Sequence, residues 1–250
     1  MAIYQTEAIV LGVHNWGDAD KIVTFFTKER GKVRAAAFGC RRPRSPLAGG
    51  MQMFNRLEVR LSEGTKLHTV KTCSLISRNK KITEDLTTMA YASFMAEAAL
   101  LFSPEGDQDT LLYERLCQII EAFSKRNPRV TADAAVFQIL EAAGMQLHIG
   151  ACVHCGKKIE EVAVVNLRDG GALCTDCIDT ARDVRENLPI HKDTIELIEK
   201  LSSFDWKSDE PMKIKGSALI EAEHILTGYL FYLFGKPMKS LEFLQQIAGK

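Results

Sequence analysis

The sequence predicts an α+β fold, in which a small N-terminal β-barrel precedes an all-helical domain that carries a short cysteine-containing insertion. Residues 1–80 hold short runs of β-branched and aromatic residues separated by turns. Residues 81–250 hold apolar residues at helical spacing, and four cysteines lie in two pairs at about 150–180. We therefore expect one domain over 1–80 and a second over 81–250.

The first 80 residues are expected to form five strands. They are predicted at 8–13, 22–26, 33–38, 57–61 and 66–76. Apolar and polar residues alternate at 57–61, Leu-Glu-Val-Arg-Leu, which indicates a strand buried on one face. Five short strands joined by turns favour a small barrel or a sandwich. A barrel of the OB type closes such a sheet with few exposed edges, and it is the fold we predict here.

The remainder of the chain is expected to be helical outside the cysteine insertion. One long helix is predicted over 83–102, and apolar residues at helical spacing predict others at 112–123 and from Thr131 onward. The clearest amphipathic pattern covers 219–233. Gly235 and Pro237 follow it and are typical helix terminators.

Charge is distributed unevenly along a chain whose formal net charge is zero. Residues 1–80 contain 14 Lys and Arg but only 6 Asp and Glu, so the rest of the chain carries the compensating negative excess. A basic first domain favours a polyanionic partner, although a solvated lysine-rich face would give the same count. The chain has no apolar run of roughly 18 residues and no secretory signal, so we expect a cytoplasmic protein without membrane contact.

Two cysteine pairs predict a metal site. Cys152, Cys155, Cys174 and Cys177 form the pattern C-x2-C-x18-C-x2-C, whose spacing is typical of one structural Zn²⁺ bound by four thiolates. A predicted strand at 162–166 and a turn at 169–171 make the segment resemble a zinc ribbon. Disulfides are disfavoured in the cytoplasm, and a catalytic zinc keeps one position open. His154 is expected beside the site or exposed, and the other three cysteines are expected to be inert.

A basic loop is the candidate nucleic-acid site. Arg41, Arg42 and Arg44 lie in the Gly- and Pro-rich segment 38–50, where a flexible loop could follow a phosphate backbone. Three further basic residues are expected to extend this surface: Lys21, Lys32 and Arg34. A solvated basic loop without a ligand is the alternative.

Three aromatic residues near this segment are candidates for stacking with bases. They are Trp16, Phe38 and Phe54. Because most aromatic residues of a small barrel belong to its core, a core position is preferred for Phe38 and Phe54.

No common catalytic motif is present, so we predict that the chain is not an enzyme and has no small-molecule substrate. Asp18 and Asp20 could suggest Mg²⁺ binding and nuclease chemistry. A role in stabilising their turn is the preferred interpretation. A zinc-stapled adaptor that binds only proteins is the other alternative.

Several segments resemble one family across nearly the whole chain. The stretches 17–32 and 38–45, the Gly49-Gly50 pair leading to 57–59, the cysteine pairs and the segment 235–244 are similar to the RecO family of DNA repair proteins. Leu241 departs from the family pattern, which often has arginine there. An assignment of a functional basic residue to the C-terminal motif is correspondingly weaker.

The resemblance implies an OB-fold, a helical domain and a zinc-binding segment. It also implies a mediator of recombination in the RecF pathway, acting in the cytoplasm at the nucleoid. Such a protein binds single- and double-stranded DNA and anneals complementary strands. Together with RecR, it helps RecA to load onto DNA that is covered by single-strand-binding protein.

Overall fold

The computed structural model describes residues 2–159, 162–181, 183–208 and 210–248. The chain forms two compact units, residues 1–129 and 130–250. The expected boundary near residue 80 therefore marks the end of the barrel, whereas the first compact unit also includes the helices that follow it.

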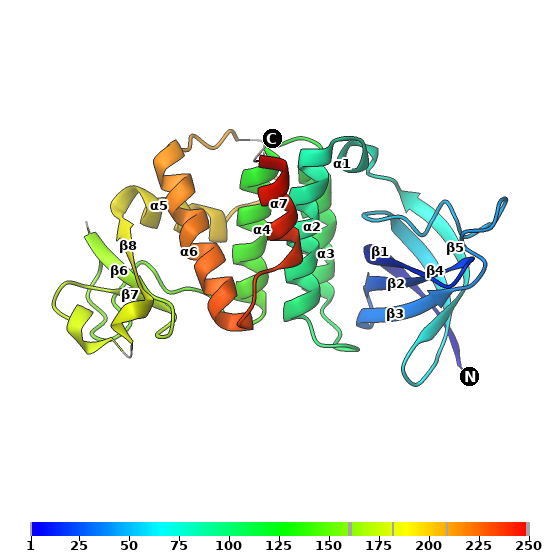
Figure 1. Ribbon diagram of the computed structural model, residues 1–250, viewed down its shortest axis with the longest axis horizontal. Helices are drawn as coiled ribbons and strands as arrows, with labels where there is room; N and C mark the ends of the chain where they lie inside the picture. Colours follow the sequence, from blue (N-terminus) through cyan, green and yellow to red (C-terminus); the bar gives the residue numbers. More distant parts are fainter. Residues whose placement is uncertain (1, 160–161, 182, 209, 249–250) are drawn as a thin grey trace. The chain divides into compact units, whose positions relative to one another are not determined.

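A closed five-stranded barrel begins the chain, as the sequence predicts (Figure 1). Its strands are β1 (Ile3–Trp16), β2 (Asp20–Thr27), β3 (Gly31–Ala37), β4 (Arg56–Ser62) and β5 (His68–Ser77). They follow the order β1-β2-β3-β5-β4, in which only the β3–β5 pair is parallel. This closed arrangement of five strands is that of an OB-fold.

β1 is longer than expected because it pairs with two neighbours. Its first half pairs with β4 and its second half with β2, and a bulge lies between Val10 and Gly12. The bulge bends the strand so that it can serve both sides of the closed sheet. In β4, Leu57, Val59 and Leu61 are buried, which confirms the predicted alternation.

Three helices complete the first unit: α1 (Lys80–Glu84), α2 (Leu86–Phe102) and α3 (Thr110–Phe123). The prediction of a single helix over 83–102 is wrong at its start, because residues 83 and 84 belong to α1 and α2 begins at Leu86. Asp85 is extended, and its carboxylate accepts a hydrogen bond from the Thr88 amide at 2.7 Å, which begins a new helix. Buried residues occupy most of the circumference of α2 and many of them are alanines, which explains why no narrow apolar stripe is visible in its sequence.

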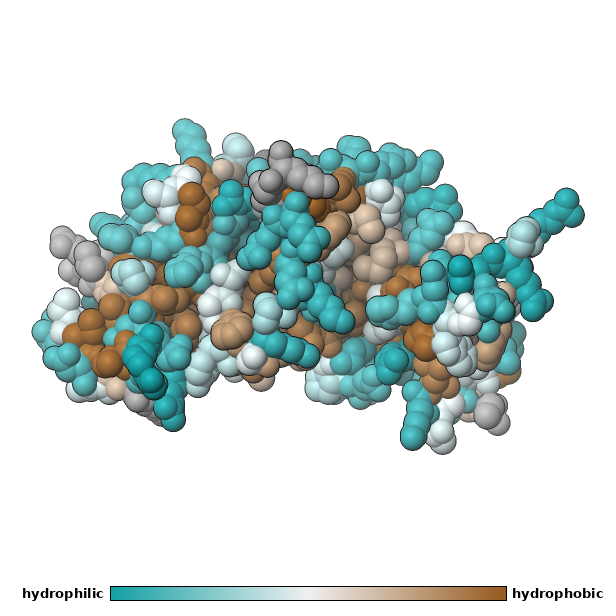
Figure 2. All heavy atoms as spheres, viewed as in Figure 1, coloured by the Kyte–Doolittle hydropathy of each residue, from teal (hydrophilic) through white to brown (hydrophobic). Residues whose placement is uncertain are grey.

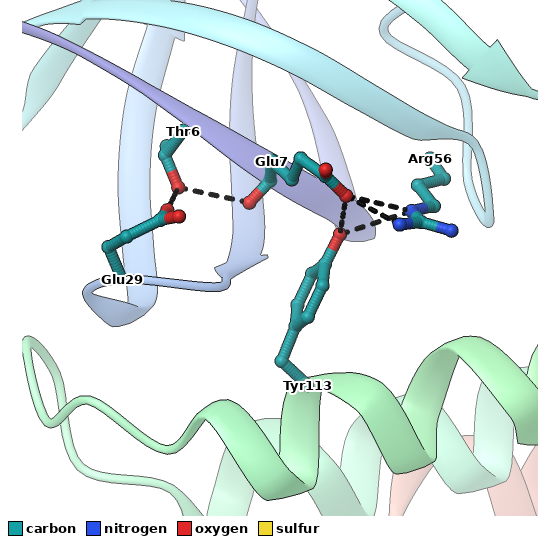
Figure 3. A network of polar contacts seen from close by, with 5 residues as sticks. All are labelled: Thr6, Glu7, Glu29, Arg56 and Tyr113. Atoms are coloured by element: carbon teal, nitrogen blue, oxygen red, sulfur yellow. Dashed lines mark hydrogen bonds and ion pairs between the residues drawn. The ribbon is translucent and has the colours of Figure 1, made fainter.

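A polar contact joins the barrel to α3 within this unit. Arg56 Nη2 lies 2.5 Å from Glu7 Oε2, and the Tyr113 hydroxyl donates to the same carboxylate at 3.2 Å (Figure 3). Tyr113 is 1% exposed. The figure shows its ring rising from α3 toward β1 and β4, so a buried residue of the helix links two barrel strands.

The second unit combines helices with a small sheet. Its elements are α4 (Pro128–Ala142), β6 (Val162–Asn166), β7 (Gly171–Leu173), β8 (Asn187–His191), α5 (Lys192–Ser202), α6 (Gly216–Phe234) and α7 (Lys239–Ala248). The strands form an antiparallel sheet in the order β7-β6-β8. Gly235 ends α6 in a left-handed conformation, φ 67°, as expected for a helix terminator. Sequence patterns did not predict β8, α5 or α7.

Close packing joins the sheet region to α6. A Cβ atom at Gly228 would lie 3.3 Å from a methyl group of Leu188 and 3.5 Å from one of Leu167. A glycine at this position therefore lets α6 approach the sheet closely. Among the described residues, no helix is both long enough and apolar enough to cross a membrane.

Candidate nucleic-acid interface and metal centre

The segment 38–55, called here the β3–β4 loop, contains no regular strand or helix, as expected. Its turns are closed by successive backbone hydrogen bonds, such as Arg42 N to Gly39 O at 3.1 Å and Ser45 N to Arg42 O at 3.2 Å. Figure 1 shows the loop extending from one end of the barrel, and Figure 2 shows hydrophilic side chains projecting there.

Hydrogen bonds from backbone amides tie the start of the β3–β4 loop to the residue just before β2 and to the first residue of β2. Gly39 N donates to Asp20 Oδ1 at 2.7 Å, and Arg41 N donates to Ala19 O at 2.8 Å. Four apolar side chains of the loop are buried: Cys40, Leu47, Met51 and Phe54. The loop is therefore packed into the end of the barrel and hydrogen-bonded to the β1–β2 turn. Asp20 therefore holds the start of the β3–β4 loop, a contact that the sequence did not predict.

The three arginines of the loop are all exposed. Arg41 Nη1 donates to Gly17 O at 3.1 Å, which directs its side chain toward the β1–β2 turn. Arg44 has a left-handed backbone, φ 64°, which is uncommon for a residue with a side chain. Neither Arg42 nor Arg44 forms an ion pair within the described part of the chain. Their guanidinium groups face solvent and could bind phosphate.

The other three predicted residues have different surroundings. Lys21 Nζ donates to Met51 O at 3.1 Å, so this side chain lies against the β3–β4 loop. Lys32 Nζ donates to Leu100 O at 2.9 Å, and burial lowers the pKa of this amine. Arg34 is exposed on the outer face of β3. Lys21 therefore joins the loop arginines, whereas Lys32 is engaged with α2.

Lys32 and Arg34 line a basic cleft of about 430 Å³. Three other residues that sequence reasoning missed also line it: Arg30, Lys66 and His68. They come from the β2–β3 turn, the β4–β5 connection and the start of β5, which only the folded barrel brings together. Burial lowers the pKa of His68, and Arg30 forms an ion pair with Glu63.

The aromatic candidates divide into one core residue and an exposed pair. Phe54 is fully buried, as expected. Phe38 is 53% exposed, so the predicted core position is wrong. Trp16 is 45% exposed, and its ring centroid lies 6.0 Å from that of Phe38. Phe38 is the first residue of the β3–β4 loop, whereas Ala37 before it belongs to the barrel core.

The four predicted cysteines meet at one place, and they could hold a metal ion. Their sulfur atoms all lie within 4.8 Å of one another, and Cys155 Sγ is 3.7 Å from Cys174 Sγ. A tetrahedral site with metal–sulfur bonds of about 2.3 Å has sulfur–sulfur edges of about 3.8 Å. The cluster therefore has the dimensions of a four-thiolate metal centre.

A backbone hydrogen bond closes a turn at each cysteine pair. Gly156 N donates to Cys152 O at 2.8 Å, with Gly156 in a left-handed conformation, φ 75°, and Cys177 N donates to Cys174 O at 2.9 Å. Burial opposes ionisation of Cys152, but backbone N–H groups directed at its sulfur lower its thiol pKa to about 6. Hydrogen bonding with Cys155 raises the pKa of Cys177 to about 12. A bound cation would stabilise all four thiolates together.

His154 lies beside this cluster and takes no part in it. Its Nδ1 atom is 2.7 Å from Thr180 Oγ1, and its Nε2 atom is 3.3 Å from Asp169 Oδ2. These contacts link the first turn to the β6–β7 turn and to the segment after Cys177. The expectation that His154 is an exposed neighbour of the site is confirmed.

The remaining cysteines lie elsewhere. Cys40 is buried, and Cys73 and Cys117 are half-buried. Burial raises the pKa of each of these thiols, which favours the unreactive protonated form.

Comparison with known proteins assigns both parts of the chain to one family. Residues 1–79 match the family model "Recombination protein O N terminal", and residues 83–242 match "Recombination protein O C terminal". DNA repair protein RecO of Symbiobacterium thermophilum is 29% identical, with 99% of this chain and 98% of the relative covered.

Two further relatives with the same name show similar coverage. RecO of Bifidobacterium animalis subsp. lactis is 30% identical, with 98% of this chain and all of the relative covered. RecO of Bacillus cereus is 28% identical, with 97% of each covered. The likeness therefore extends over the whole length of these relatives.

Proposed function

This chain belongs to the RecO family of DNA repair proteins, and from this premise we propose that it is a DNA-binding recombination mediator. It binds single- and double-stranded DNA and promotes annealing of complementary strands. With RecR, it helps RecA to load onto DNA covered by single-strand-binding protein. It does this in the cytoplasm, at the nucleoid, and it needs no catalytic site.

The exposed arginines of the ordered β3–β4 loop are the observation that carries this proposal. Arg41, Arg42 and Arg44 present three guanidinium groups from a loop whose backbone is already fixed, so little conformational freedom is lost when phosphate binds. Arg34 and Lys21 extend the positive surface, while Lys32 contributes from the neighbouring cleft. Phosphate contacts carry no base information, so binding has little sequence preference.

Annealing follows from the same surface without covalent chemistry. Two complementary strands repel each other through their phosphates, and arginine side chains that replace condensed counterions reduce this repulsion. Strands held close together in this way can form base pairs.

The cysteine cluster holds one structural Zn²⁺ in this proposal. Cys152, Cys155, Cys174 and Cys177 would bind it, and the ion would join the two turns that flank the β6–β7 hairpin. Because four thiolates complete a tetrahedral shell, the ion has a role in folding and not in catalysis.

The proposal is tested by anisotropy of labelled single-stranded DNA over a salt series. The variant Arg41→Ala/Arg42→Ala/Arg44→Ala is compared with wild type. We expect weaker binding and a log–log salt slope flattened by about 0.7 for each phosphate that the variant no longer neutralises. The charge-matched control is Lys207→Ala/Lys213→Ala/Lys236→Ala, which removes three exposed lysines from the second unit.

Two results would contradict this assignment. Equal binding by wild type and the arginine variant would move the DNA site away from the β3–β4 loop. If wild type does not bind DNA at all, a zinc-stapled adaptor that binds only proteins becomes the better interpretation.

A further inference from the structure

Trp16 and Phe38 form an exposed aromatic pair beside the arginine loop. We propose that this pair is a stacking platform for unpaired bases, so that the barrel binds the bases as well as the phosphates of a single strand. The proposal rests on the proposed DNA-binding function and deepens it. It assigns the site to unpaired nucleic acid in particular.

The register of the barrel explains why the two rings meet. Trp16 pairs with Asp20 across the β1–β2 hairpin, and the next residue of β2, Lys21, pairs with Ala37 at the end of β3. The side chain of Ala37 is in the barrel core. Phe38, the residue that follows, is 53% exposed, so its side chain lies outside the core. Trp16 and Phe38 therefore flank the beginning of β2 on the outside of the barrel.

The pair is held by hydrogen bonds to the backbone on both sides. Asp20 Oδ1 accepts from Gly39 N, the residue after Phe38, and Ala19 O accepts from Arg41 N. The β1–β2 turn and the start of the β3–β4 loop are thereby fixed to each other. The rings are available for stacking without the ordering of a flexible segment.

The surroundings of the rings identify the ligand. Arg41 reaches the β1–β2 turn through its bond to Gly17 O, next to Trp16 in the chain. Arg34 is exposed on the outer face of β3, the strand that leads into Phe38. A cationic side chain beside exposed rings matches a chain of phosphates that carries aromatic bases. An acidic protein segment would use the cations but would not require stacking.

Base pairing would remove this contact. In a duplex the bases are stacked on one another, so their faces are not available to Trp16 and Phe38. Phosphate contacts by the arginines remain possible with either form. The aromatic pair therefore favours single strands, whereas the arginines do not distinguish them from duplexes.

The test separates bases from phosphates. Full-length protein is titrated with a labelled oligothymidylate and with a deoxyribose-phosphate chain of equal length that has no bases. We expect wild type to bind the oligothymidylate about tenfold more tightly. Trp16→Leu/Phe38→Leu keeps apolar side chains but removes both rings. It should bind the two ligands equally, with unchanged affinity for the abasic chain and for duplex DNA.

Two further variants serve as controls. Trp16→Phe/Phe38→Tyr retains both rings and should retain the preference for bases. Phe231→Ala removes another exposed ring, 54% exposed on α6, and should have no effect.

DNA should quench tryptophan fluorescence in wild type, and this quenching should disappear in Trp16→Phe while binding persists, since only Trp206 then remains.

The outcomes distinguish this proposal from the function on which it rests. If wild type binds both ligands with equal affinity, the platform is wrong but phosphate binding stands. If Trp16→Leu/Phe38→Leu loses affinity for the abasic chain as well, the rings act only by supporting the loop. If wild type binds neither ligand, both the proposed function and the platform are overturned.

Discussion

The hydroxyl of Tyr113 on α3 donates a hydrogen bond of 3.2 Å to the carboxylate of Glu7 on β1. Arg56 on β4 binds the same carboxylate, and its Nε atom also lies 3.3 Å from the Tyr113 hydroxyl. One polar contact thus connects two strands of the barrel with a helix of the following segment. This connection is one reason why the first compact unit extends beyond the barrel to residue 129.

The Tyr113→Phe variant should destabilise the protein. The substitution keeps the buried ring but leaves Glu7 and Arg56 without the hydroxyl, so the free energy of unfolding should fall by about 1 kcal/mol. Urea denaturation followed by circular dichroism measures the change. Tyr232→Phe, at a site 40% exposed on α6, is the control and should differ from wild type by less than about 0.5 kcal/mol. Equal stability of the two variants would contradict the assigned role of the hydroxyl.

The contribution of Glu7 should depend on pH. Hydrogen bonding to Arg56 lowers the pKa of Glu7 below its usual value of 4.5. The ionised carboxylate therefore stabilises the fold above pH 4.5, and this stabilisation is lost as the pH falls through the lower pKa of the folded state. Glu7→Gln should be less stable than wild type at pH 7, by about 1 kcal/mol or less because the pair is partly exposed.

Denaturation at a series of pH values should show the difference between Glu7→Gln and wild type closing below pH 4.5. Glu114→Gln, an exposed substitution on α3, should show no comparable trend. A stability difference for Glu7→Gln that does not change with pH would mean that the ion pair with Arg56 is not its cause.

The left-handed backbone at Arg44 predicts that substitution by glycine affects stability differently at residue 44 and at residue 42. A left-handed conformation costs a residue with a side chain about 1 kcal/mol more than glycine. Arg44→Gly relieves this cost, whereas Arg42→Gly only adds flexibility to the unfolded chain. The free energy of unfolding should therefore be about 1 kcal/mol higher for Arg44→Gly than for Arg42→Gly. Both variants should bind DNA more weakly, so stability and binding change independently at residue 44.

Metal removal should affect the second unit selectively. One zinc ion per chain is expected by elemental analysis, and Cys174→Ser should lose it, whereas Cys117→Ser should retain it. Without the ion, the segment that includes the two cysteine turns should become sensitive to protease, because metal binding supplies its folding energy. DNA binding through the β3–β4 loop should persist. Full zinc content in Cys174→Ser would exclude the cysteine cluster as the site.

Local patterns were sufficient wherever neighbouring residues decide the structure. The alternation of Leu57, Val59 and Leu61 indicated the buried face of β4, and the two cysteine pairs indicated their own cluster. Gly235 indicated the end of α6. In each case the relevant constraint acts within a few residues: the period of a strand, the geometry of a turn, or the backbone freedom of glycine.

Other features depended on partners far away in the sequence. An aromatic residue such as Phe38 is expected in the core of a small barrel. The register of β2 and β3 instead places it outside, beside Trp16. The sequence predicted Lys32 as a basic residue of the surface, but it gave no sign that its amine also donates a hydrogen bond to Leu100 O on α2. Nothing in the sequence around Lys66 and His68 indicated that they line a basic cleft together with Arg34.

The sequence by itself determined the order of barrel and helices, the basic character of the barrel segment, the arginine loop and the four cysteines that cluster. The tertiary structure decided which of the basic and aromatic side chains reach solvent and which of them lie together. The physical reason is that alternation and turn geometry are local properties of the chain. Burial and hydrogen-bond pairing instead depend on atoms that only strand register and helix packing bring into contact.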